Sequence, residues 1–258
     1  AAKKPVKIAM VGKYFATGDF VLADSYISVI EAIKHAAWSF GAKPALTWIN
    51  AEEYEKNPGK LKELSGFDGV LIPGGFGARG VEGKIRAIEY VRKHKIPYFG
   101  LCYGMKLATV EFARHAAGLK GAHTGEINPK SPALVINVMS DQAKNLAVKK
   151  YGGSMRLGAY KCRLKKGTLA YSAYQKDLIS ERHRHRYEFN NQYRELLAEK
   201  GLVFSGLNPE RDLVEIIELS KTAHPWFVGV QFHPEFQSRP LHPHPLFKAF
   251  IKAALAKK

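Results

Sequence analysis

The chain has 258 residues, of which 46% are hydrophobic and 24% charged; this suits one large α/β domain or two small ones and excludes a disordered or collagenous protein. Lysine and arginine total 40 against 23 acidic residues, a net charge of +17, but they are spread along the chain without a nucleic-acid-binding motif, so a nucleic-acid partner is not expected. Two cysteines cannot form a disulfide framework. No apolar run approaches the roughly 20 residues that span a bilayer, and residues 1–5 lack the apolar stretch of a signal peptide. These features favour a cytoplasmic protein without membrane contact.

Strand-like and helix-like segments alternate through the first 120 residues. Short apolar runs that end at turn sequences predict strands, and apolar positions at helical spacing predict helices. In chain order we expect a strand at 7–11, a helix at 24–40 capped by Asp24 or Ser25, a strand at 44–49, a polar helix at 52–64 broken at 57–59, a strand at 67–72, a helix at 81–94, a strand at 96–101 and a helix at 103–117. This alternation is typical of a parallel sheet with helices on both faces.

Strands dominate the second half of the chain. We expect strands at 133–138, 156–164, 202–204, 214–219 and 226–232, with helices only at 191–200 and 246–256. Segments 139–153 and 172–190 are long and polar, which predicts loops. Because no linker or internal repeat divides the chain, residues 1–258 are expected to form one α/β domain whose parallel sheet is extended by antiparallel strands.

The pentapeptide Gly-Leu-Cys-Tyr-Gly at 100–104 is the strongest chemical signal. A nucleophile flanked by glycines between a strand and a helix is typical of a nucleophile elbow. The thiol of Cys102 then lies at a helix N-terminus, which favours the thiolate. A buried structural cysteine is the alternative, and we assign that role to Cys162, which lies mid-strand without flanking glycines.

A base and its orienting group are expected at His233 and Glu235. On an extended backbone, residues i and i+2 project to the same side, so the carboxylate can hold the imidazole that takes the thiol proton. The glycine-rich loop at 73–77 follows another strand of the same sheet, and its N–H groups can face an oxyanion. This loop lacks the Gly-Lys-Ser/Thr of a phosphate loop.

Other polar and aromatic residues have less specific interpretations. The run Arg182 to Arg186 is consistent with a solvated basic loop, and adjacent arginines disfavour a metal ion at its two histidines. We expect His242 and His244 to lie on the surface. The three tryptophans, Trp38, Trp48 and Trp226, are expected to have core or packing roles.

With these motifs together, the chain resembles the class I glutamine amidotransferases, and within them the C-terminal glutaminase domain of CTP synthase. The resemblance covers nearly the whole chain and implies a flavodoxin-like fold. The cysteine elbow and His-Pro-Glu are shared by many amidotransferases, whereas Arg-His-Arg-His-Arg and Met-Arg-Leu-Gly are typical of CTP synthase. The segments that carry the resemblance are 10–14, 70–77 with Arg79 and Gly80, 100–105, 155–158, 181–188 and 231–236.

The resemblance implies a catalytic role for five of these positions. Cys102, His233 and Glu235 would form a triad in which the thiol attacks the side-chain amide of L-glutamine, ammonia leaves, and water releases glutamate from the thioester. The backbone N–H groups of Gly74 and Tyr103 would form the oxyanion hole.

The resemblance also implies how glutamine is bound. Glu126 would hold the α-ammonium and Arg186 the α-carboxylate, because a zwitterion needs one acid and one bidentate cation. The remaining contacts would come from Gly75, Phe76, Tyr103, Gly104, Met105 and Lys106. No cofactor or metal is implied for this domain.

The chain departs from the family pattern at three places. Lys106 stands where the elbow usually continues with glutamine; its ammonium is expected to repel the substrate ammonium and lower glutamine affinity, unless its stem carries the charge into solvent. Residues 123–125, ahead of Glu126, and the segment 139–153 also differ from the usual sequence.

The resemblance implies a partner as well. In CTP synthase the ammonia aminates UTP to CTP in a separate synthetase domain, which would bind ATP, Mg²⁺ and UTP and which these residues do not supply; the full-length enzyme is expected to be a homo-oligomer. Two alternatives stay open: a non-catalytic or regulatory paralogue on the same fold, and a different enzyme such as a γ-glutamyl hydrolase. The intact triad favours the glutaminase.

Because the sequence contains no phosphate loop, we predict that this chain neither makes CTP nor binds ATP tightly. Calorimetric titration with Mg-ATP should reveal no saturable site in the micromolar range. A stoichiometric site of that affinity would contradict the assigned domain content.

Overall fold

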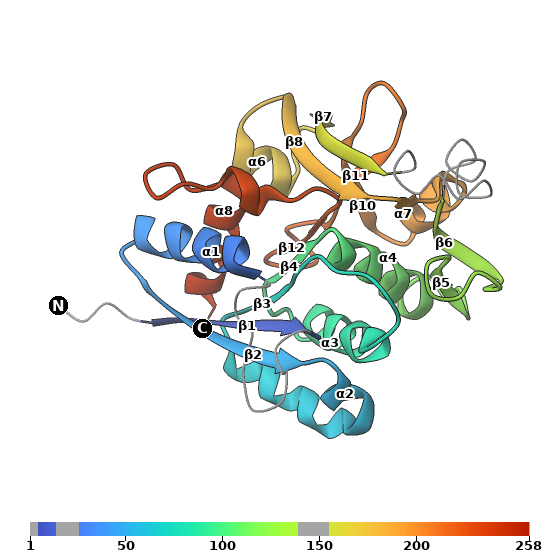
Figure 1. Cartoon of the computed structure of the whole chain (residues 1–258), viewed down its shortest axis with the longest axis horizontal. Helices are drawn as coiled ribbons and strands as arrows, with labels where there is room; N and C mark the ends of the chain where they lie inside the picture. Colours follow the sequence, from blue (N-terminus) through green and yellow to red (C-terminus); the bar gives the residue numbers. More distant parts are fainter. Residues whose placement is uncertain (1–4, 14–25, 139–154, 258) are drawn as a thin grey trace.

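The computed structural model of the chain describes residues 5–13, 26–138 and 155–257 and is built on a nine-stranded sheet. The sheet has the order β2-β1-β3-β4-β12-β11-β10-β7-β8 (Figure 1). The first five strands in this order run parallel to their neighbours, and the remaining four continue the sheet antiparallel. The strands are β1 (Pro5–Gly12), β2 (Lys43–Asn50), β3 (Gly69–Ile72), β4 (Tyr98–Leu101), β7 (Arg156–Leu164), β8 (Leu178–His185), β10 (Leu202–Leu207), β11 (Val214–Leu219) and β12 (Phe227–Val230).

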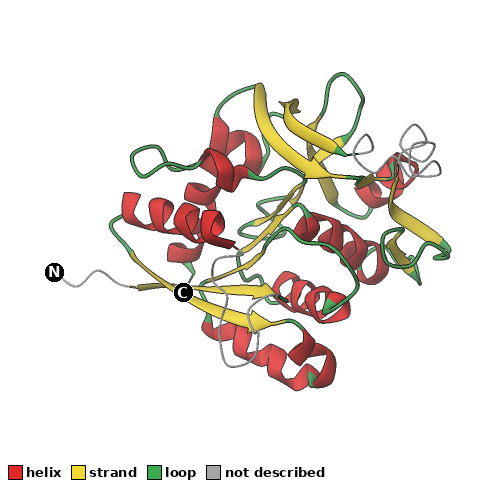
Figure 2. Cartoon of the chain, viewed as in Figure 1, coloured by secondary structure: helices red, strands yellow, loops and turns green. Residues whose placement is uncertain are grey.

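Helices cover both faces of the parallel part of the sheet (Figure 2). Side chains alternate between the faces along each strand: in β1, Ile8 and Met10 pack in the core with α1 (Ile27–Ser39) and α8 (Pro245–Ala256), whereas Ala9 and Val11 pack with α3 (Val81–Lys93) and α4 (Tyr103–His115). The expected parallel sheet with two helical layers is confirmed. The shorter helices are α2 (Glu52–Lys56), η2 (Pro58–Gly66), α6 (Leu169–Tyr174), η4 (Asn191–Tyr193), α7 (Arg194–Glu199) and η5 (Pro234–Gln237).

Most elements expected from the sequence lie within a few residues of their observed bounds. The polar segment 52–64 divides at Asn57 into α2 and the 3-10 helix η2, because the Asn57 side chain accepts a hydrogen bond from the N–H of Gly59 and starts a new turn. The expected caps Asp24 and Ser25 and the expected loop 139–153 lie outside the described residues. In the described part of the chain, no helix is both long and apolar enough to cross a bilayer.

A small second sheet stands beside α4 and carries residues of the site. It consists of β5 (Ala122–Thr124), β6 (Ala133–Val138) and β9 (Tyr187–Phe189), with β5 parallel and β9 antiparallel to β6. Glu126 follows β5 closely and Arg186 directly precedes β9. Of its three strands, the sequence predicts only β6. β5 is short, and β9 falls in a segment expected to be a loop.

The expectation of a loop at 172–190 is wrong. The segment contains the end of α6 and the strands β8 and β9. Burial alternates along β8, but three of its four buried residues are polar: Glu181, His183 and His185 beside Ile179. A strand with a polar buried face does not show the apolar alternation by which strands are identified. The run of histidines and arginines is therefore an ordered strand with its histidines inside, not a solvated loop.

A buried ion cluster holds the polar face of β8. The guanidinium of Arg156 lies 3.2 Å from Glu188 and 2.8 Å from Glu215, and His185 lies 2.8 Å from Glu188. Burial, followed by the charge of Arg156, lowers the pKa of His183 to about 2. Both effects favour a neutral imidazole, and the adjacent guanidinium disfavours a cation at this place.

The expectation that His244 lies on the surface is also wrong, and the three tryptophans differ in burial. His244 is buried and caps α8, with Nε2 2.9 Å from Glu181, because a surface-like proline-rich turn folds back onto β8. Trp38 is 55% exposed in the last turn of α1, whereas Trp226 is buried and Trp48 partly buried.

Close backbone contacts explain the glycines around the turn from β4 into α4. A Cβ atom at Gly104 would lie 2.3 Å from the carbonyl oxygen of Ile72, and one at Gly100 would lie 2.5 Å from the Tyr98 hydroxyl. Such separations are far below van der Waals contact, so the helix can approach β3 this closely only where no side chain intervenes.

We therefore predict that Gly104→Ala lowers the free energy of unfolding by about 3 kcal/mol, because the methyl group would have to displace β3 backbone. Gly66→Ala is the matched control, since a Cβ atom there meets nothing within 4 Å. Urea denaturation of both variants checks the prediction. Equal stability of the two variants would contradict the close packing of α4 on β3.

Candidate active site

Cys102 lies in a strained turn between β4 and α4. Its φ of 47° and ψ of −93° are unusual for a residue with a side chain, and its N–H donates a 2.6 Å hydrogen bond to the carbonyl of Val230 on β12. The residue is 3% exposed. The sharp turn places the thiol at the carboxyl edge of the parallel strands and at the start of a helix, as the glycine pattern predicts.

His233 and Glu235 meet where the chain leaves β12. Nδ1 of His233 lies 2.7 Å from Oε1 of Glu235, and the His233 N–H donates to the carbonyl of Arg182 on β8 at 2.8 Å. Phe236 stacks on the His233 ring with centroids 5.3 Å apart. The imidazole is thus held by a carboxylate and an aromatic ring, and it lies close enough to Cys102 to act on the pKa of the thiol.

The electrostatics of Cys102 and His233 favour an ion pair. Burial opposes ionisation of the thiol, but the charge and hydrogen bond of His233 outweigh it and lower the pKa of Cys102. Burial likewise opposes the imidazolium, but Cys102 and Glu235 raise the pKa of His233 to about 10. A thiolate beside an imidazolium is a prepared nucleophile with a proton donor next to it.

Cys162 has the opposite environment. It is fully buried in β7, and burial followed by the charges of Glu215 and Glu181 raises its pKa well above the ordinary thiol value. Its position agrees with the structural role expected for it. Both cysteines are free thiols.

Gly74 lies directly against the triad. A Cβ atom there would come within 2.8 Å of Cε1 of His233 and 3.7 Å of Cβ of Cys102. Tyr103 is the first residue of α4, where helix N–H groups lack intrahelical acceptors. Gly74 and Tyr103 are therefore placed where N–H groups could approach an oxygen bound at the thiol.

One cavity of about 720 Å³ contains most of the expected site residues. The residues expected from the sequence that line it are Gly74, Gly75, Phe76, Cys102, Lys106, Glu126, Arg186, His233 and Glu235. Tyr103 and Met105 are fully buried and do not line the cavity, and neither does Gly104, so contacts from these three residues would have to come from the main chain. The Tyr103 hydroxyl instead donates to the carbonyl of Gly77 at 2.7 Å.

Some residues of the site were not expected. Arg184, His185 and Tyr187 line the cavity, as do residues 26–29 at the start of α1. The amide of Gln231 donates to Sγ of Cys102 over 3.6 Å. The sequence does contain a pattern that predicts the placement of Gln231. It stands two residues before His233, and residues i and i+2 of an extended chain project to the same side.

Lys106 points into the site rather than into solvent. Its side chain is 4% exposed, and Nζ lies 3.8 Å from Oε2 of Glu126 and 5.6 Å from the ring centroid of Tyr187. The other oxygen of Glu126 accepts a 3.0 Å hydrogen bond from the N–H of Gly77. The solvent-directed alternative for Lys106 is therefore wrong, and its ammonium is paired with the acid expected to bind substrate.

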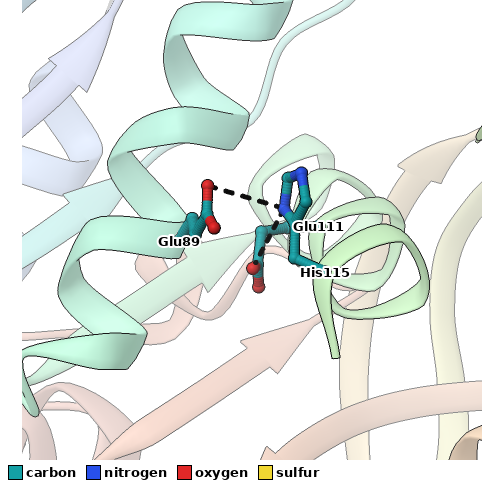
Figure 3. Close-up of side chains that lie close together, drawn as sticks. All are labelled: Glu89, Glu111 and His115. Carbon is teal, nitrogen blue, oxygen red and sulfur yellow. Dashed lines mark ion pairs between the residues drawn. The ribbon is translucent and has the colours of Figure 1, made fainter. Parts of the chain in front are cut away.

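A group that could hold a metal ion lies elsewhere, between α3 and α4 (Figure 3). His115 is 3.7 Å from Glu89 and 3.4 Å from Glu111. However, the guanidinium of Arg92 already binds both oxygens of Glu111, at 2.8 and 2.7 Å. The cluster is balanced by protein cations and does not contribute to the cavity.

Comparison with known proteins places the chain in a family. The profile of the class I glutamine amidotransferases matches residues 21–253. CTP synthase of Caldanaerobacter subterraneus is 57% identical over 251 residues, which are 97% of this chain and 44% of that protein. CTP synthase of Geobacillus kaustophilus is 53% identical over 98% of this chain and 45% of its own length. The chain thus spans less than half the length of these relatives.

Solved structures agree with this result. The glutaminase domain of Trypanosoma brucei CTPS with bound acivicin superposes with a TM-score of 0.88 at 35% identity, over 98% of this chain and 95% of that domain. A glutamine amido transferase from Methylobacillus flagellatus, 12% identical over 90% of this chain and 71% of its own, shares the fold with a TM-score of 0.52. The chain belongs to the class I glutamine amidotransferase family and, within it, to the glutaminase domains of the CTP synthase type.

Proposed function

We propose that this chain hydrolyses L-glutamine to L-glutamate and ammonia. The observation that carries the proposal is the pairing of Cys102 with a His233 that Glu235 holds at 2.7 Å, in a cavity that also contains Glu126 and Arg186. A thiol is activated by an adjacent base that a third group orients, and His233 and Glu235 can fill these two roles. An acid and a cation in the same cavity suit the α-ammonium and the α-carboxylate of an amino acid. The intact triad favours an enzyme over a non-catalytic paralogue.

In the proposed reaction, the Cys102 thiolate attacks the amide carbon and forms a carbon–sulfur bond. The N–H groups of Gly74 and Tyr103 stabilise the oxyanion of the tetrahedral intermediate. His233 gives its proton to the amide nitrogen, the carbon–nitrogen bond breaks, and ammonia leaves. His233 then takes a proton from water, the hydroxide attacks the thioester, and glutamate and the thiol are released.

The ammonia is proposed to serve a synthetase domain. The relatives that this chain matches over less than half their length are named CTP synthase, which indicates amination of UTP to CTP as the consuming reaction. ATP, Mg²⁺ and UTP would bind that domain, and the assembled enzyme is proposed to be a homo-oligomer. Two free thiols suit a reducing compartment such as the cytoplasm.

We predict that Cys102→Ala abolishes ammonia release from glutamine, because no other described thiol has a base beside it. Cys162→Ala is the matched control and should keep most of the activity. Mass spectrometry after limited treatment with iodoacetamide should find the label on Cys102. Equal or preferential labelling of Cys162 in the folded protein would contradict the assignment of the nucleophile.

The pKa shifts predict the pH dependence of thiol reactivity. The thiolate forms as the pH rises through the lowered pKa of Cys102, so alkylation should reach its plateau below the range of a free thiol, whose pKa is about 8.5. The proton donor is lost as the pH rises through the His233 pKa of about 10, so glutaminase activity should fall there. Alkylation rates and kcat/KM measured from pH 5 to 11 test both limbs.

Glu235→Gln removes the charge that stabilises the imidazolium, so the His233 pKa should fall. The same charge also raises the Cys102 pKa, so while His233 stays protonated the thiol of this variant should be no less acidic than in the parent chain. We expect kcat to fall by about 100-fold, with the alkaline limb moved to lower pH and the acid limb of alkylation not moved to higher pH. If the pH profile of this variant matches that of the parent chain, the carboxylate does not act on the imidazole.

A further inference from the structure

Lys106 belongs to the same structural unit as the nucleophile. It lies in the first turn of α4, its N–H faces the carbonyl of Cys102 at 3.2 Å, and its side chain reaches into the cavity that holds the thiol. Its 4% exposure leaves the ammonium little water, so its position is set by Glu126 and the Tyr187 ring. The charge is thus fixed inside the site.

Both oxygens of Glu126 already face a donor group of the protein. Oε1 accepts the Gly77 N–H at 3.0 Å, and Oε2 faces Nζ of Lys106 at 3.8 Å. Among the described residues that line the cavity, the other carboxylate is Glu235, which is held by His233. An ammonium entering the cavity must therefore share Glu126 with Lys106.

This arrangement affects the two ends of an amino-acid substrate differently. The α-ammonium gains attraction to Glu126 but loses much of it to repulsion by Lys106, whereas the α-carboxylate meets Arg184 and Arg186 on the cavity wall. The ammonium therefore contributes little net binding. A substrate without it would lose little affinity.

Resting on the proposed glutaminase function, we propose that Lys106 is a specificity-determining residue that neutralises Glu126, so that this site accepts ω-amides of dicarboxylic acids that lack an α-ammonium. The probe is glutaramate, which is glutamine with hydrogen in place of the α-ammonium. Its hydrolysis consumes one water and gives glutarate and ammonia through the same thioester chemistry. The discriminating quantity is the preference for glutamine over glutaramate.

The test compares this preference in the parent chain, Lys106→Gln and Lys106→Met. Two quantities are measured for each amide: kcat/KM for ammonia release, and the concentration that half-protects Cys102 from iodoacetamide. Taking the ratio cancels any general effect of the lysine on thiol reactivity, because both amides react with the same thiol. Removing the charge should increase the preference for glutamine about five-fold, through tighter binding of glutamine with glutaramate nearly unchanged.

Two control variants sharpen the result. Lys120→Gln removes an exposed lysine beyond the end of α4 and should leave the preference as it is in the parent chain. Glu126→Gln should weaken glutamine without weakening glutaramate. A purely structural role for Lys106 would change both amides equally, and an unchanged preference in both Lys106 variants would overturn the proposal.

The two readouts separate this inference from the proposed function. Hydrolysis of glutamine with an unchanged preference overturns the role of Lys106 and leaves the glutaminase standing. Protection constants whose ratio moves as expected, without ammonia release, support the role of Lys106 and overturn the glutaminase. Failure of both amides to protect Cys102 overturns both.

Discussion

The turn at Cys102 is the constraint on which the rest of the site depends. A positive φ at a residue with a side chain is costly, and it persists here because β12 accepts the Cys102 N–H and α4 is pressed against β3 at Gly104. The parallel order β3-β4-β12 brings three loops to one edge of the sheet. Gly74, Cys102 and His233 follow these three strands in turn, so the order of the strands sets the geometry of the site.

Charge pairing organises the cavity around that turn. Cys102 is balanced by His233, His233 by Glu235, and Glu126 by Lys106. Behind the cavity, a second cluster centred on Arg156 pairs with one oxygen each of Glu188 and Glu215 and disfavours protonation of the adjacent His183. Because buried charges are costly unless paired, each of these groups helps to fix the position of its neighbour.

The residues proposed to recognise the substrate lie on elements far from the nucleophile in sequence. The small sheet carries Glu126 after β5 and Arg186 before β9, and it stands against α4, whose first turn follows the nucleophile and carries Lys106. The antiparallel extension adds β8, whose carbonyl at Arg182 holds the His233 backbone. The parallel sheet thus carries the triad, and the added strands carry the residues proposed to contact the substrate.

Features that depend on neighbouring residues could be predicted from the amino-acid sequence. Three local patterns do this: the alternation of apolar strands with amphipathic helices, the glycines around Cys102, and the i, i+2 spacing of His233 and Glu235. From them the parallel sheet, the nucleophile elbow and the base can be predicted. The remaining features depend on contacts between distant segments. The buried face of β8 is polar and is stable only beside Arg156 and Glu215, and His244 is buried only because its turn folds onto Glu181. The pairing of Lys106 with Glu126 likewise joins a helix to a distant sheet, and the burial that fixes a lysine's charge exists only after both have packed.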